Sequence, residues 1–108
     1  MASQKAKAEI HSGKCGFQTS VEARSIDEKC ELTIQSDCES IRRLAENLTE
    51  VDPFQEISYR GEGPLTLKKA AECRLHTACP VPAGIIKTIE VACGLALPMD
   101  AHIKISKD

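Results

Sequence analysis

Hydrophobic and polar residues alternate in three successive segments near the beginning of the chain, starting at Ala6, Phe17 and Cys30. A period of two residues is typical of a strand that buries one face. Turn residues, including Gly13 and Gly16, separate the first two segments and indicate a hairpin. The pattern therefore predicts three consecutive antiparallel strands. Their inward-facing positions are Ala6, Ala8 and Ile10; Phe17, Thr19, Val21 and Ala23; and Cys30, Leu32 and Ile34.

Helical spacing replaces this alternation in the middle of the chain. Ser36 precedes Glu39 by three residues, a capping-box pattern that predicts the start of a first helix. Pro64 suits the first turn of a second helix. Pro80 and Pro82 precede a third helix, the most clearly amphipathic one, for which Gly94 suits the end. The apolar positions are Cys38, Ile41, Leu44, Ala45 and Leu48; Leu65, Leu67, Ala70 and Ala71; and Ile85, Ile86, Ile89, Ala92 and Cys93.

Alternation returns after Pro98, where Ala101, Ile103 and Ile105 predict a C-terminal strand. Residues 53–63 carry no clear pattern. The whole order predicts one α+β domain over residues 1–108. It consists of a three-stranded antiparallel meander, then two to three helices packed on one face, then a C-terminal strand.

Composition and charge exclude several functional classes. The chain has 108 residues, only three of them aromatic, and its formal net charge is -2. Nucleic-acid surfaces need basic patches or aromatic stacking platforms, so we expect no nucleic-acid partner. No apolar run approaches the roughly 18 residues of a membrane span, and the first residues lack a hydrophobic signal core. We therefore expect a cytoplasmic protein without membrane contact; a protein partner and the oligomeric state stay open.

Six cysteines are the feature of the chain that points to chemistry. A disulfide framework suits their even number but not a reducing cytosol. Cys30, Cys73 and Cys93 fall in phase with apolar positions or near helix ends, which favours packing roles because free cysteine behaves as a small hydrophobe.

The other three cysteines lie in or beside the connections between predicted elements. Cys15 lies in a glycine-flanked turn, and Cys38 and Cys79 precede predicted helices, where exposed amides would lower a thiol pKa. If consecutive elements alternate in direction, as short connections require, all three connections lie at one end of the sheet. His76 belongs to the same connector as Cys79.

Three cysteines and one histidine form a known ligand set for zinc and can also hold iron. The sequence therefore predicts a metal site made of Cys15, Cys38, His76 and Cys79. Cys15 and Cys38 lack the paired Cys-x-x-Cys spacing of common zinc motifs. The competing interpretation is that Cys38 joins the core and Cys15 is a turn residue. Catalysis would need an open coordination position, so enzyme activity stays undecided.

Four segments carry a resemblance that spans nearly the whole chain: Lys14-Cys15-Gly16-Phe17, Gln35-Ser36-Asp37-Cys38-Glu39, residues 76–82 and Gly94-Leu95-Ala96-Leu97-Pro98. They resemble a family of small uncharacterised proteins of methanogenic archaea and anaerobic bacteria. This resemblance implies a cytoplasmic protein in an anaerobic setting and supplies no mechanism. Such a setting favours oxygen-sensitive iron, iron–sulfur or persulfide chemistry over disulfides.

A second resemblance is local. Cys79-Pro80-Val81-Pro82, with Lys87 in the following helix, is similar to the Cys-Pro-x-Pro segment of TusA-like sulfur carriers. It implies a persulfide on Cys79 and a role in sulfur metabolism. In those carriers the motif follows the first strand, whereas here three strands and two helices are predicted before it. Three hypotheses result: a zinc or iron protein, a persulfide carrier, and a non-catalytic interaction module with buried cysteines.

Overall fold

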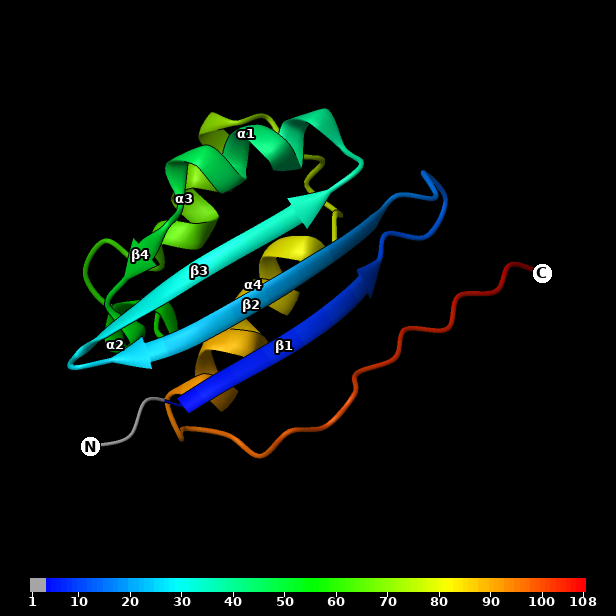
Figure 1. Cartoon of the computed structure of the whole chain (residues 1–108). Helices are drawn as coiled ribbons and strands as arrows, with labels where there is room; N and C mark the ends of the chain where they lie inside the picture. The colour runs from blue at the N-terminus through cyan, green and yellow to red at the C-terminus, as the bar shows by residue number, and fades with distance from the viewer. Residues whose placement is uncertain (1–3) are drawn as a thin grey trace.

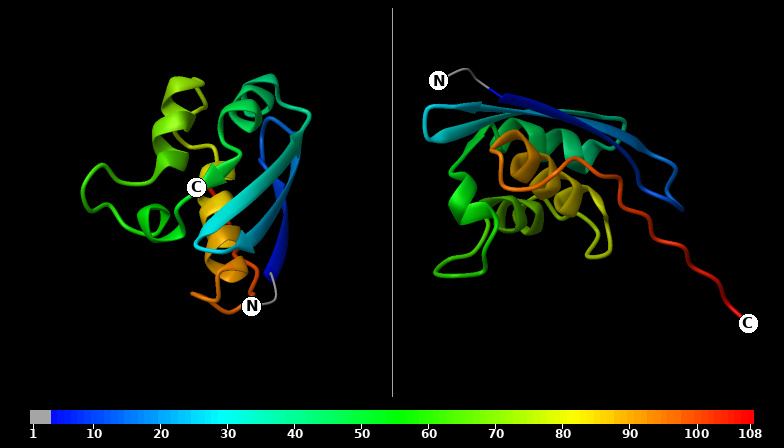
Figure 2. Two further views of the ribbon diagram at one scale, coloured as in Figure 1. Left: turned by 60° about the vertical axis from the view of Figure 1, so that its left-hand side comes forward. Right: turned by 90° about the horizontal axis from the view of Figure 1, so that it is seen from below.

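A computed structural model describes residues 4–108, which form an antiparallel sheet covered on one face by helices (Figure 1). Seen from below, the helices all lie on the same side of the sheet (Figure 2). The class predicted from the sequence, an α+β fold with a three-stranded meander, is confirmed. The elements are β1 (Gln4–His11), β2 (Gln18–Ile26), β3 (Lys29–Ser36), α1 (Glu39–Asn47), β4 (Glu50–Val51), α2 (Pro53–Glu56), α3 (Leu65–Glu72) and α4 (Val81–Ala92).

The register of the sheet aligns the apolar positions of neighbouring strands. Ala8 lies opposite Val21, and Val21 lies opposite Ile34, so these side chains share the helix-covered face. The alternation is thus confirmed as the period of a half-buried sheet. Phe17 is an exception, because β2 begins one residue later and the Phe17 side chain is exposed.

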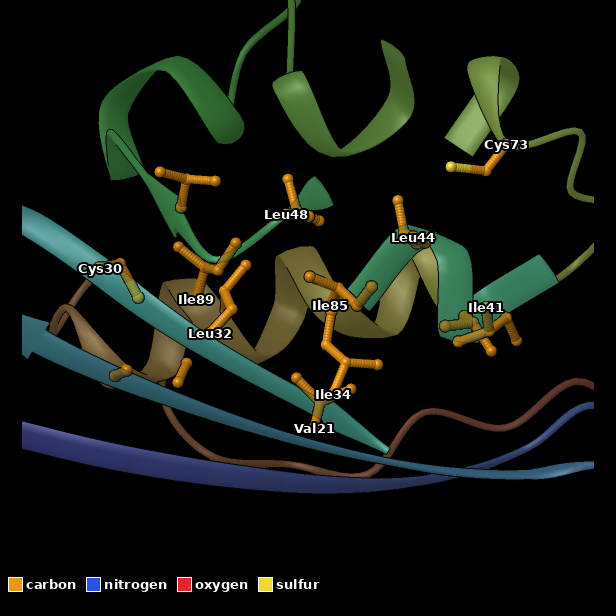
Figure 3. Packing of buried hydrophobic residues seen from close by; sticks show 14 residues of the cluster. Val21, Cys30, Leu32, Ile34, Ile41, Leu44, Leu48, Cys73, Ile85 and Ile89 are labelled. Carbon is orange, nitrogen blue, oxygen red and sulfur yellow. The ribbon is translucent and has the colours of Figure 1, made fainter. Parts of the chain in front are cut away.

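The core lies between the sheet and helices α1 and α4 (Figure 3). Leu44 of α1 and Ile85 and Ile89 of α4 are fully buried against strand residues such as Val21 and Ile34. Burying one such aliphatic side chain stabilises the fold by about 1.5–3 kcal/mol. The predicted inward faces of α1 and α4 are therefore the faces that hold the helices on the sheet.

Helix α1 begins two residues later than a capping box at Ser36 would place it. Ser36 is the last residue of β3, and its hydroxyl hydrogen-bonds to Thr19 Oγ1 at 2.8 Å and accepts the backbone N–H of Cys38 at 3.1 Å. The N-cap residue is Cys38, which makes no side-chain cap hydrogen bond. The capping-box prediction was wrong because strand pairing holds Ser36 in the sheet.

Residues 53–63, which carry no clear pattern in the sequence, contain one buried carboxylate that links them to α3. Glu56 is 1% exposed, and its oxygens accept hydrogen bonds from the backbone N–H of Leu65 at 2.7 Å and of Thr66 at 2.8 Å, and from the Thr66 hydroxyl. These N–H groups belong to the first turn of α3, which has no intrahelical partners for them. Glu56 therefore caps a helix that begins nine residues after it.

The predicted C-terminal strand does not form. Residues 95–108 have no regular secondary structure, and the side chains of Ile103 and Ile105 are 78% and 89% exposed. The fourth strand of the sheet is instead β4, which pairs with β3 through Cys30 and Val51. Alternation specifies which side chains would share a face, but a strand also needs a neighbour to accept its hydrogen bonds. In the part of the chain that is described, no helix is long and apolar enough to cross a membrane.

Candidate functional site

Three connections lie at the same end of the sheet (Figure 1). They are the β1–β2 hairpin with Cys15, the β3–α1 connection with Cys38, and the α3–α4 connector with Cys79. Two elements absent from the prediction, β4 and α2, leave this arrangement intact. Strand β4 is antiparallel to β3 and so continues in the same direction as α1, away from the end with the three connections. The four-residue α2 lies at the other end of the sheet, so α3 still leads back to the end that holds Cys15 and Cys38.

Cys79 lies at the centre of the group. Its half-buried thiol packs against the edge of the core, and the Cys38 and Cys15 thiols are close enough to raise its pKa. Burial is the largest cause of the raised pKa, a hydrogen bond from the Val81 backbone N–H opposes it, and the two thiols add to it. The clustering inferred from the direction of the elements thus brings three of the four predicted ligands together.

The lowered pKa predicted for Cys79 was wrong. The N-cap of α4 is Pro80, and Pro80 and Pro82 carry no backbone N–H, so Val81 is the one residue among these three with an amide to offer. A single amide does not offset the loss of hydration on burial, and the pKa of Cys79 rises above its ordinary value.

Cys38 occupies an extended backbone conformation at the N-cap of α1, with φ -84° and ψ 125°. Its side chain is half-buried and packs against the hydrophobic core. Cys38 therefore fits part of each interpretation of the sequence: it packs on the core with the apolar face of α1, and its thiol also lies near that of Cys79, as a shared metal site would require.

Cys15 is exposed in a tight hairpin that two glycines shape. Gly13 and Gly16 have φ of +85° and +74°, a conformation that L side chains rarely adopt. The hairpin is closed by the Ser12 N–H, which donates to Phe17 O at 3.0 Å, and by the Gly16 N–H, which donates to Gly13 O at 2.9 Å. Cys15 is thus carried on a short loop at the end of the sheet where Cys79 lies, within electrostatic reach of its thiol.

Ser12 is a member of the site that the sequence did not reveal. Its Oγ atom is buried and has no hydrogen bond of standard geometry among the described residues. It nevertheless lies near enough to the Cys79 thiol to lower the pKa of that thiol, against the larger effect of burial. Nothing in the local sequence signals this burial, because neighbouring segments create it.

His76, the fourth predicted ligand, is exposed in the α3–α4 connector. Its carbonyl accepts the Cys79 N–H at 3.0 Å, but no described contact brings the imidazole to the thiols. Within residues 4–108, no group of three or more His, Cys, Asp or Glu side chains has an arrangement that could hold a metal ion. The three thiols are therefore neighbours without coordination geometry.

The remaining cysteines occupy the positions expected of packing residues. Cys30 and Cys73 are 0% and 8% exposed, as predicted, and Cys93 is half-buried against the core. Cys30 also contacts Cys93, a pairing that the sequence did not predict. Burial first, and then the Cys93 thiol, raise the pKa of Cys30 to about 12. A second thiol group thus lies at the C-terminal end of α4.

Fold and site together define a small α+β domain with a three-thiol cluster at one end of its sheet. Residues 6–105 match the Family of unknown function (DUF6951), and the chain belongs to this family. Comparison with curated proteins finds no match, and comparison with solved structures finds none either.

Proposed function

We propose that this protein binds a thiophilic metal ion, zinc or iron, through Cys15, Cys38 and Cys79, with His76 as the fourth ligand. One observation carries the proposal: three thiols from three separate connections lie at the same end of the sheet, close enough for two of them to raise the pKa of the third. Sulfur and imidazole ligands are the set that zinc and iron sites use.

The electrostatics of the cluster favour a cation. Neighbouring thiols make it harder for Cys79 to become a thiolate, and a divalent ion reverses this because it attracts every thiolate in reach. Metal binding would therefore release protons and draw the three sulfur atoms to about 2.3 Å from the ion.

The placement of the ligands supports the closing motion that this requires. Cys79 and Cys38 are half-buried and packed on the core, whereas Cys15 and His76 are exposed in loops. The first two would anchor the ion, and the two exposed residues would move towards it. Loops are the segments that most easily change conformation on binding.

The alternative function is a persulfide sulfur carrier centred on Cys79, which its Cys-Pro-x-Pro sequence favours. Attack of the Cys38 thiolate on the inner sulfur of a Cys79 persulfide would form a Cys38–Cys79 disulfide and release hydrosulfide. This function has weaker support, because reactive thiols are exposed and have a lowered pKa, whereas Cys79 is half-buried and its pKa is raised.

Metal analysis of protein purified without oxygen tests the proposal. We expect about one equivalent of zinc or iron per chain, lost in Cys38→Ser and Cys79→Ser and retained in the matched control Cys93→Ser, whose thiol lies at the opposite end of α4 beside Cys30. Reconstitution with Co²⁺ should give a thiolate-to-cobalt charge-transfer band that is absent from Cys79→Ser. Protein that neither retains nor takes up these ions would overturn the proposal.

Alkylation of Cys79 separates the remaining hypotheses. A metal ligand reacts slowly until a chelator is added, whereas a persulfide carrier reacts quickly without one and releases sulfide on reduction. A buried structural thiol reacts slowly in both conditions and becomes accessible only on unfolding. The last result would favour the interaction module.

A further inference from the structure

Residues 95–108 present an apolar segment to solvent. Every one of these residues is exposed, and five of them are large and hydrophobic. Figure 2 shows this segment leaving the body of the protein. The family match extends to residue 105, so most of the segment is part of the family domain. The exposed hydrophobic residues are Leu95, Leu97, Met99, Ile103 and Ile105.

Strand β1 is an edge strand whose inward-facing side chains are apolar, like those of the exposed C-terminal segment. All eight of its residues pair with β2, and no described strand pairs with its other side. Its inward-facing residues Ala6, Ala8 and Ile10 are only half-buried. An edge strand of this length with unpaired backbone groups is a template for strand addition.

We propose that residues 101–105 of a second copy of this chain add to β1 as an antiparallel strand, and that two copies exchange these segments. Placing Ile103 opposite Ile10 sets Ile105 opposite Ala8, so apolar side chains meet on the helix-covered face. The same register sets Lys104 opposite Glu9 on the outer face, where opposite charges attract.

The outer face of β1 has a charge pattern that suits this register. Lys5 and Lys7 each lie near Glu22, with nitrogen–oxygen distances of 3.6 and 3.9 Å. Glu9 forms no ion pair with any described residue, and neither does Lys104. The strand addition would join the two.

The chain's own segment does not reach this register. A Cβ at Gly94 would lie 3.7 Å from Gln4 Oε1, so the segment starts near the beginning of β1, and Figure 1 shows it running on in the same direction as β1, whereas antiparallel pairing needs the opposite direction. Antiparallel pairing places residue 101 opposite Ser12, one residue beyond the end of β1 and eight residues from Gln4, or roughly 27 Å. The seven residues from Gly94 span at most about 25 Å when fully extended. A second copy has no such constraint, and reciprocal exchange closes a two-fold dimer.

The mass of the full chain in solution tests this inference, measured by light scattering over a range of concentrations with reductant and chelator present. We expect a dimer of two 11.7 kDa chains. The double variant Ile103→Asp/Ile105→Asp should be monomeric, and Leu97→Asp, which changes an equally exposed residue outside 101–105, should stay dimeric. Circular dichroism of each variant verifies that the body is folded.

A charge exchange tests the register. Glu9→Lys and Lys104→Glu should each raise the dimer dissociation constant several-fold, and the double exchange should restore it. A monomeric wild-type chain at every concentration would overturn the inference. A dimer that survives Ile103→Asp/Ile105→Asp would also overturn it, as would hydrogen-exchange protection of residues 101–105 in a monomer.

Discussion

The two ends of α4 carry thiol groups in opposite surroundings. At its C-terminal end, the buried Cys30 contacts the half-buried Cys93 at the edge of the core, and Cys30 has no exposed surface. At its N-terminal end, Cys79 lies beside Cys38 and Cys15, and all three belong to connections between elements. Cys30 and Cys93 pack in positions where aliphatic side chains could stand. Cys15, Cys38 and Cys79 instead bring three sulfur atoms together on connections between secondary-structure elements.

This difference shows that the number of cysteines says less than their positions. A thiol on a strand or helix face is held by its neighbours and desolvated, which makes it inert. A thiol on a connection keeps access to solvent and to other connections at the same end of the sheet. Substitutions at the two ends should therefore have different effects.

The largest expected effect is on metal affinity. Cys79→Ser should weaken Zn²⁺ binding by at least about 100-fold, because a thiolate ligand from the half-buried anchor is lost. Cys93→Ser, at the other end of the same helix, should leave the affinity unchanged. Competition titration against a chromophoric chelator measures both, and equal losses in the two variants would mean that the ends are not distinct.

The second effect concerns stability at the end that holds Cys30, where β4 leads into α2 and Glu56. Glu56→Ala should lower the free energy of unfolding by about 3 kcal/mol, since it leaves the Leu65 and Thr66 N–H groups without their acceptor. Asp52→Ala, which removes the cap of the exposed Phe54 N–H, should cost only about 1 kcal/mol. Urea denaturation compares them, and a smaller loss for Glu56→Ala than for Asp52→Ala would contradict the capping role.

The third effect is a dependence of stability on alkaline pH. The Cys30 thiol titrates at about 12 in the folded protein, against an ordinary value of 9.0. Above pH 9 the unfolded chain loses a proton that the folded chain retains, so stability should fall as pH rises from about 9 to 12. The slope approaches about 1.4 kcal/mol per pH unit for one fully shifted group. Denaturation of reduced protein at several pH values measures this slope.

Cys30→Ala is the control for that measurement and should have a visibly shallower slope. Cys79, whose pKa is raised as well, contributes in the same direction, so part of the slope should remain in this variant. An unchanged slope in Cys30→Ala would place the titrating group elsewhere.

The smallest effect is expected at Cys15. Cys15→Ala should change the free energy of unfolding of the metal-free protein by no more than about 0.5 kcal/mol, because the side chain is exposed. The same variant should bind Zn²⁺ more weakly than the unaltered chain. A large loss of stability without metal would show that Cys15 packs like the cysteines at the other end.

Local pattern determined much of the fold. The alternation of Val21 with polar neighbours and the helical spacing of Ile85 and Ile89 each specify an element and its buried face, because the periods of strand and helix are properties of the backbone. The burial of Cys30 and Cys73 follows from the same periods. The gathering of Cys15, Cys38 and Cys79 at one end could be inferred as well, since short connections force consecutive elements to alternate in direction.

Tertiary structure alone decided the rest. The cap that Glu56 provides for α3, the burial of Ser12 and the raised pKa of Cys79 all arise between segments that are distant in sequence or held by their neighbours. The alternation around Ile103 is as regular as that around Ala8, yet Ala8 lies in a strand and Ile103 does not. A pattern of side chains describes one strand, but a sheet needs a second backbone in hydrogen-bonding position, and only the packing of the whole chain decides where that backbone lies.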